Sequence, residues 1–126
     1  MFKLKQYQIN TIEVLKSYLS GARFSDPKSA YDTIQKENYG QGQYKPFNSL
    51  EDLEDAPYVC LRLPTGGGKT LLSAHTIKLA SEHYLESDYP LTLWLVPTDK
   101  IKQQTLETLT DEDHPNRQVL NDAFGG

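Results

Sequence analysis

The sequence predicts an α/β domain in which helices flank a mostly parallel sheet. Three observations support this fold class. A glycine-rich run over residues 63–70 separates a strand-like segment from a helix-like one, a second strand-like and a second helix-like segment follow, and 126 residues suffice for one small domain. This strand–helix–strand–helix order is typical of doubly wound parallel sheets.

The first expected element is a helix over residues 4–19. Its apolar residues recur at helical spacing on one face, with Gln8 between them, and Gly21 is expected to end the helix. The apolar residues are Leu4, Ile12, Leu15 and Leu19. The basic residues near this helix are interpreted as a solvated face; they are Lys3, Lys5, Lys16 and Arg23.

Residues 21–55 are polar and broken by prolines and glycines, which is typical of an insertion between two functional stretches. A short helix is expected over residues 26–36, with Ala30, Tyr31 and Ile34 as its apolar anchors. A second short helical turn is expected over residues 49–53.

The glycine-rich run reads Leu63-Pro64-Thr65-Gly66-Gly67-Gly68-Lys69-Thr70. An expected strand over residues 58–63 precedes it, and an expected helix over residues 71–85 follows it. Consecutive glycines let backbone N–H groups converge on phosphate oxygens, while Lys69 supplies a positive charge and Thr70 a hydroxyl suited to Mg²⁺. The general phosphate-loop pattern asks for glycine at position 63, which is leucine here. The alternative is a plain glycine-rich turn with Lys69 on the surface.

A second expected strand covers residues 91–96, which are apolar on both alternating faces. Pro97 and Thr98 end it, and a helix is expected over residues 99–109. Residues 111–126 are interpreted as an acidic and then mixed tail.

The composition narrows the class of protein. A net charge of −4 excludes a simple basic nucleic-acid binder, although a local basic groove remains compatible with it. The sequence lacks an apolar run long enough to cross a membrane, and it shows no signal peptide. Its single cysteine, Cys60, cannot form an internal disulfide, so we expect a reducing, cytoplasmic setting. The three histidines show no spacing typical of a zinc site.

Three segments resemble superfamily 2 helicases and translocases of the DEAD/DEAH type. Residues 64–70 are similar to the first motif of that family, in which a Pro-Thr-Gly opening takes the place of the leading glycine. Residues 95–104 are similar to its next motif, with Ile101 where leucine is common. Residues 4–8 resemble its Tyr-Gln element. The triple-glycine loop and the Tyr-Gln start together most resemble the restriction (R) subunit of type III restriction enzymes.

The resemblance implies a partial RecA-like P-loop domain. Residues 1–20 would form an adenine-recognition helix, residues 21–55 an insertion, residues 56–110 the βαβα core and residues 111–126 a tail. ATP and Mg²⁺ are the implied cofactors. Double-stranded DNA is the implied partner, together with a modification (methyltransferase) subunit.

The resemblance also implies roles for particular residues. Gln8 would bind the adenine edge, Lys69 would bridge the β- and γ-phosphates as the catalytic lysine, and Thr70 would hold Mg²⁺. The whole nucleotide site would comprise Gln8, Thr65, Gly66, Gly67, Gly68, Lys69 and Thr70. The implied nucleic-acid contacts come from the second motif: Pro97, Thr98 and Gln104.

ATP hydrolysis in this family needs an Asp-Glu pair at the end of a buried strand. Asp111 and Glu112 match the letters, but they follow a polar helix-like run and Pro115 comes soon after, so we reject them as that pair. We therefore expect the N-terminal part of a longer protein, or a truncated gene product, that alone binds ATP weakly, if at all, and does not turn it over. Two alternatives stay open: another P-loop enzyme such as a kinase, and a non-catalytic remnant that serves as a binding module.

Overall fold

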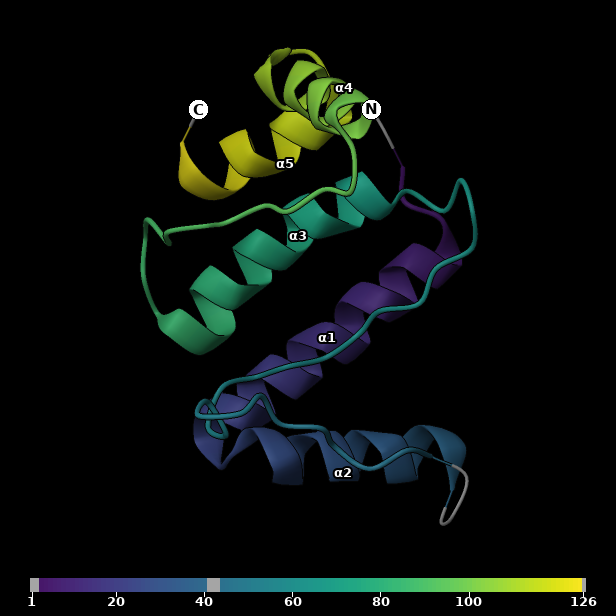
Figure 1. Cartoon of the computed structure of the whole chain (residues 1–126), viewed down its shortest axis with the longest axis vertical. Coiled ribbons are helices and arrows are strands. Elements are labelled where there is room, and N and C mark those ends of the chain that lie inside the picture. Colours follow the sequence, from purple (N-terminus) through teal and green to yellow (C-terminus); the bar gives the residue numbers. More distant parts are fainter. Residues whose placement is uncertain (1–2, 41–43, 126) are drawn as a thin grey trace.

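The computed structural model describes residues 3–40 and 44–125, and its regular elements are helices (Figure 1). α3 runs directly into a π-helical turn, η1. The elements in chain order are α1 (Gln6–Phe24), α2 (Pro27–Tyr39), α3 (Lys69–Ala80), η1 (Ser81–Leu85), α4 (Asp99–Thr110) and α5 (Pro115–Phe124).

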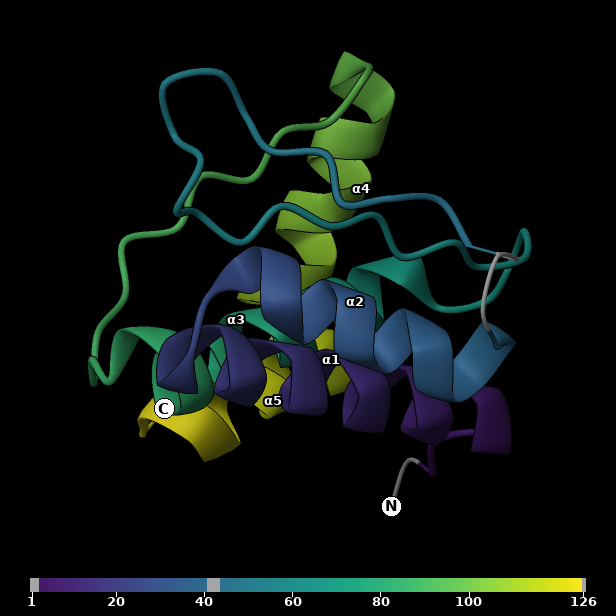
Figure 2. The same cartoon turned by 90° about the horizontal axis from the view of Figure 1, so that it is seen from below.

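The expected α/β fold class is wrong, because the described residues contain no strand and no sheet. Residues 58–63 and 91–96, which were expected to be strands, have no regular secondary structure and do not pair with each other. Both flank α3 and line a shared hollow of about 390 Å³ instead. Figure 2 shows these connections on one side of the helices. A strand needs a hydrogen-bonded neighbour, which an apolar pattern alone does not supply.

α1 and α2 pack closely where Gly21 meets Ala30. A Cβ at position 21 would lie 3.1 Å from the Ala30 Cβ, so the glycine permits the close approach of the two helices. The expectation that Gly21 ends the helix is therefore wrong. α1 continues to Phe24, and the Ser25 N–H donates to the Gly21 carbonyl.

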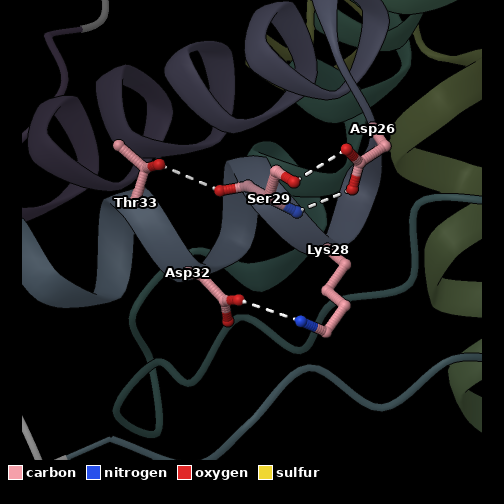
Figure 3. A network of polar contacts seen from close by, with 5 residues as sticks. All are labelled: Asp26, Lys28, Ser29, Asp32 and Thr33. Atoms are coloured by element: carbon pink, nitrogen blue, oxygen red, sulfur yellow. Dashed lines mark hydrogen bonds and ion pairs between the residues drawn. The ribbon is translucent and has the colours of Figure 1, made fainter.

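α2 begins with a well-formed cap (Figure 3). Asp26 accepts hydrogen bonds from the Ser29 backbone N–H at 2.8 Å and from the Ser29 hydroxyl at 2.7 Å. These bonds, the backbone one first, hold the pKa of Asp26 below its usual value. Pro27 occupies the first turn, where its missing N–H costs nothing. The cap and the proline explain why the helix expected over residues 26–36 forms at this place.

The buried core lies among the first three helices and η1. Its buried members are Leu15, Tyr18, Leu19, Ala22, Ala30 and Leu79. Partly buried residues pack around them: Ile12, Tyr31, Ile34, Val59, Ala80 and Tyr84. The Tyr18 hydroxyl is buried without a hydrogen bond of normal geometry, and burial raises the pKa of Tyr18 to about 12, although the nearby Tyr58 backbone acts in the opposite direction.

The later part of the chain packs less completely. α5 packs against α3, and α4 contacts α5 while burying none of its own residues. α5 lies within the segment interpreted as a tail, so that interpretation missed a helix. The helical turn expected over residues 49–53 is a tight turn with a single bridge between Leu50 and Leu53. None of the described helices has both the length and the apolar character that crossing a membrane requires.

Candidate functional site

The glycine loop makes a tight turn that leads directly into α3. The Gly67 N–H donates to the Pro64 carbonyl at 2.9 Å, and Gly68 caps the helix with a φ of 79°. α3 therefore begins at Lys69, two residues earlier than expected, and the loop lies at the positive end of the helix dipole.

Glycine is required at two loop positions for steric reasons. A Cβ at Gly67 would lie 2.7 Å from the Pro64 carbonyl oxygen, and a Cβ at Gly68 would lie 2.6 Å from Gln8 Nε2. Gly66 has a φ of 74° but faces open space. The loop is therefore packed on its α1 side and open on the other.

The first turn of α1 holds the loop in place. The Tyr7 hydroxyl donates to the Gly67 carbonyl at 2.9 Å, and Gln8 Nε2 donates to the same oxygen at 3.0 Å. Gln8 Oε1 accepts from the Lys5 backbone N–H at 2.8 Å. We call Tyr7 and Gln8 the loop clamp. Gln8 is only 4% exposed, so its amide is part of the support beneath the loop.

A cavity of about 490 Å³ opens beside the loop. Three lysines line it, namely Lys3, Lys5 and Lys69, and Thr70 lies next to Lys69 at the same wall. No carboxylate is among the described lining residues. In a chain of net charge −4, this cavity is a local concentration of positive charge suited to a polyphosphate.

The start of α5 also lines the cavity, through His114, Pro115 and Asn116. His114 Nδ1 accepts from the Asn116 backbone N–H at 3.1 Å, and Asn116 Nδ2 donates to Thr108 Oγ1 at 3.2 Å. These bonds join the start of α5 to α4. Part of the segment that was expected to be a tail therefore lines the cavity.

The structure brings most of the predicted nucleotide-site residues together. Gly66, Gly68, Lys69 and Thr70 line the cavity with Gln8. Gly67 is buried and its carbonyl faces the loop clamp, whereas Thr65 lies exposed at the outer turn of the loop.

The predicted nucleic-acid residues lie elsewhere, at and near the start of α4. Thr98 caps this helix by accepting from the Ile101 N–H at 3.2 Å, while Pro97 and Gln104 are exposed. The expectation that Pro97 and Thr98 stand at the end of a strand is wrong, because the segment before them is unpaired.

The sequence alone gave no site role to four of the residues that line the cavity, namely Lys3, Lys5, Tyr7 and His114. Lys3 and Lys5 were interpreted as part of a solvated helix face, the Tyr7 hydroxyl was given no role, and His114 was placed in a tail. The Tyr-Gln pair was the available signal for Tyr7. Asp111 and Glu112, rejected as the acid pair, lie exposed in the turn before α5. Within the described ranges no cluster of three acidic, histidine or cysteine side chains could hold a metal.

The sequence matches one family model, described as "Type III restriction enzyme, res subunit", over residues 1–124. No curated protein and no solved structure matches it. The match spans the loop clamp, the glycine loop and all the residues that line the cavity.

Proposed function

Because the chain belongs to the family of type III restriction enzyme res subunits, a helicase-like family that uses ATP and Mg²⁺, we propose that its glycine loop binds ATP with Mg²⁺. The bound nucleotide serves an ATP-dependent helicase or translocase that acts on DNA.

The observation that carries this proposal is the position of the loop. It lies at the N-terminus of a twelve-residue helix, and it opens on a cavity lined by three lysines. Backbone N–H groups, a helix dipole and lysine ammonium groups all favour the same ligand, a compact and highly charged anion.

Within this site Lys69 contacts the β- and γ-phosphates, and Thr70 supplies its hydroxyl to Mg²⁺. The backbone N–H groups of Thr65, Gly66 and Gly68 surround the phosphate oxygens. The loop, Lys69 and Thr70 together provide every group that this scheme uses to bind MgATP.

For the nucleic-acid partner we propose double-stranded DNA, contacted at the exposed start of α4. Thr98 is the helix cap there, and helix N-termini are suited to phosphate oxygens. Pro97 precedes Thr98, and Gln104 lies further along α4. We propose that the whole enzyme cleaves DNA at specific sites. Its proposed protein partner is a methyltransferase subunit.

Nucleotide binding is tested by isothermal titration of MgATP into the chain and into Lys69→Ala. We expect the variant to bind at least about tenfold more weakly, since it loses one charge-assisted contact to phosphate. Lys100→Ala is the matched control, because Lys100 is exposed on α4 and outside the cavity, and its affinity should equal that of the wild type. Absence of MgATP binding by a wild-type chain with its helical circular dichroism intact would refute the proposal and favour a non-catalytic binding module.

A further inference from the structure

A second cavity, of about 350 Å³, lies where α3, α5 and the connection after η1 meet. We call it the α5 pocket. It shares no lining residue with the cavity beside the glycine loop, and the function proposed above gives it no role. Its described lining residues are mostly apolar and include a single charged side chain. The residues that carry the argument are Ile77, Tyr89, Pro90, Arg117, Leu120 and Phe124.

One face of α5 builds much of this pocket. Arg117, Leu120 and Phe124 follow one another at steps of three and four residues, which places them on one face of the helix. All three are half-buried, and α5 packs against α3, which contributes Ile77. Tyr89 comes from the connection and is 82% exposed, so the packing of the protein does not hold its ring. The pocket therefore combines a fixed helical face with an aromatic ring that can pack on a ligand.

The charge of Arg117 has no counter-charge within the described part of the chain. Its Nη1 donates to the Leu109 carbonyl at 3.3 Å, and its Nε is buried without a hydrogen bond. None of the ion pairs among the described residues includes Arg117, and none of the described carboxylates lines the α5 pocket. A guanidinium has five N–H donors, and partial burial without an anionic partner raises its free energy. An anion bound in the pocket would supply that partner.

We propose that the α5 pocket binds a small organic anion with an aromatic ring, of the class of aromatic carboxylates. The carboxylate accepts from the Nη groups of Arg117, because the forked guanidinium matches two carboxylate oxygens. The ring packs against Phe124, Leu120 and Tyr89, which offer it aromatic and apolar surface. A volume of about 350 Å³ is within the range of pockets that hold small ligands. One cation among apolar side chains favours a singly charged ligand over a polyphosphate, so the two cavities select different ligands.

The charge requirement is tested by NMR titration of the chain with naphthoate and with naphthylmethanol, which has the same ring system but no charge. We expect naphthoate to bind at least about fivefold more tightly, because only naphthoate accepts charge-assisted hydrogen bonds from Arg117. Arg117→Met keeps an unbranched apolar side chain and should reduce the affinity for naphthoate to that for the alcohol. Arg62→Met is the matched control, since Arg62 is exposed and outside the α5 pocket, and it should leave both affinities unchanged.

Two further measurements locate the ring of the ligand. Tyr89→Ala should weaken both ligands by a similar factor of about threefold, and it serves if Arg117→Met fails to fold, because Tyr89 is exposed. Nuclear Overhauser contacts from the naphthalene protons should reach the side chains of Leu120 and Phe124. Leu93, an exposed side chain outside the pocket, should show none.

Three outcomes would overturn the proposal. The first is equal affinity for naphthoate and naphthylmethanol, including no detectable binding of either. The second is an unchanged affinity for naphthoate in a folded Arg117→Met, and the third is a set of ring contacts confined to residues 91–95. None of these outcomes bears on MgATP binding, because the two cavities share no lining residue, so the proposed function would still stand.

Discussion

Leucine side chains are buried in one region of the molecule and exposed in another. The first region comprises the helices α1, α2 and α3, and the second is the segment 91–110. Leu15, Leu19 and Leu79 are 4–6% exposed in the first region, whereas Leu91, Leu93 and Leu95 are 81–102% exposed in the second. We call the first region the packed helices and the three exposed leucines the apolar strip. No residue of segment 91–110 is buried.

The difference teaches what an apolar pattern needs in order to be buried. A helix satisfies its own backbone, so an apolar face has only to meet another face, as α1 meets α2 and α3. An extended segment satisfies its backbone only through a neighbouring strand. The apolar strip has the sequence of a strand without a paired neighbour among the described residues, and it therefore remains exposed.

The largest expected effect compares one leucine from each region. Leu15→Ala should lower the free energy of unfolding by about 2–5 kcal/mol, because it leaves a cavity in the core. Leu93→Ala should change it by less than about 0.5 kcal/mol, since Leu93 is 82% exposed. Urea unfolding followed by circular dichroism measures both. Equal losses in the two variants would show that the apolar strip is packed after all.

The next prediction tests whether the glycine loop is packed against α1, as the packed helices are packed against one another. Gly68→Ala should cost about 2–3 kcal/mol, because its φ is positive and its new Cβ would meet Gln8 Nε2. Gly125→Ala is the matched control, with a φ of 77° and nothing within 4 Å of the new Cβ, and it should cost about 1–2 kcal/mol. The same unfolding experiment applies, and a cost at Gly68 no larger than at Gly125 would mean that Gln8 does not support the loop.

The helices were predictable from the sequence because their signals are local. Asp26 and Pro27 mark the start of α2, and Thr98 marks the start of α4, where the expected helix over residues 99–109 is observed as Asp99–Thr110. The sheet was predicted wrongly because pairing depends on neighbours far away in the chain. Gly21 was misinterpreted for the same reason, since its role is set by Ala30 on another helix.

The site was predictable in part. The order Gly-Lys-Thr at the start of a helix identified the loop, because that chemistry is carried by consecutive residues. The contribution of α5 to the cavity was not predictable, since His114 reaches the cavity through the packing of α5 on α3. Lys3 and Lys5 look like an ordinary solvated face until the loop is placed beside them.

A smaller effect is expected at the buried Tyr18 hydroxyl within the packed helices. Tyr18→Phe should raise the free energy of unfolding by about 1 kcal/mol, because it removes a buried hydroxyl that lacks a hydrogen bond of normal geometry. The pKa of Tyr18 is raised from 10.0 to about 12, so the unfolded chain ionises first. Wild-type stability should therefore fall as pH rises from about 10 to about 12, and the variant should lack this contribution. Urea unfolding at pH 8 and pH 11 measures both effects. A Tyr18→Phe variant that is less stable than the wild type at pH 8 would show that the hydroxyl has a hydrogen-bond partner.

The smallest effect lies at the exposed cap of α2. The pKa of Asp26 is lowered in the folded chain, chiefly by the Ser29 backbone N–H, so its contribution to stability is present above the ordinary carboxyl pKa. That contribution is lost as pH falls through the lowered value. Asp26→Asn keeps an acceptor for the Ser29 N–H and should therefore show a weaker decline of melting temperature between pH 5 and pH 2. An unchanged decline would mean that the cap does not titrate with folding.

Amide hydrogen exchange with and without MgATP tests the central claim, that the glycine loop beside the packed helices binds nucleotide while the apolar strip takes no part. We predict slower exchange at residues 65–70 and at the first turn of α1 when MgATP is added, with residues 91–96 exchanging fast in both conditions. Unchanged exchange at residues 65–70, or protection confined to residues 91–96, would contradict the account.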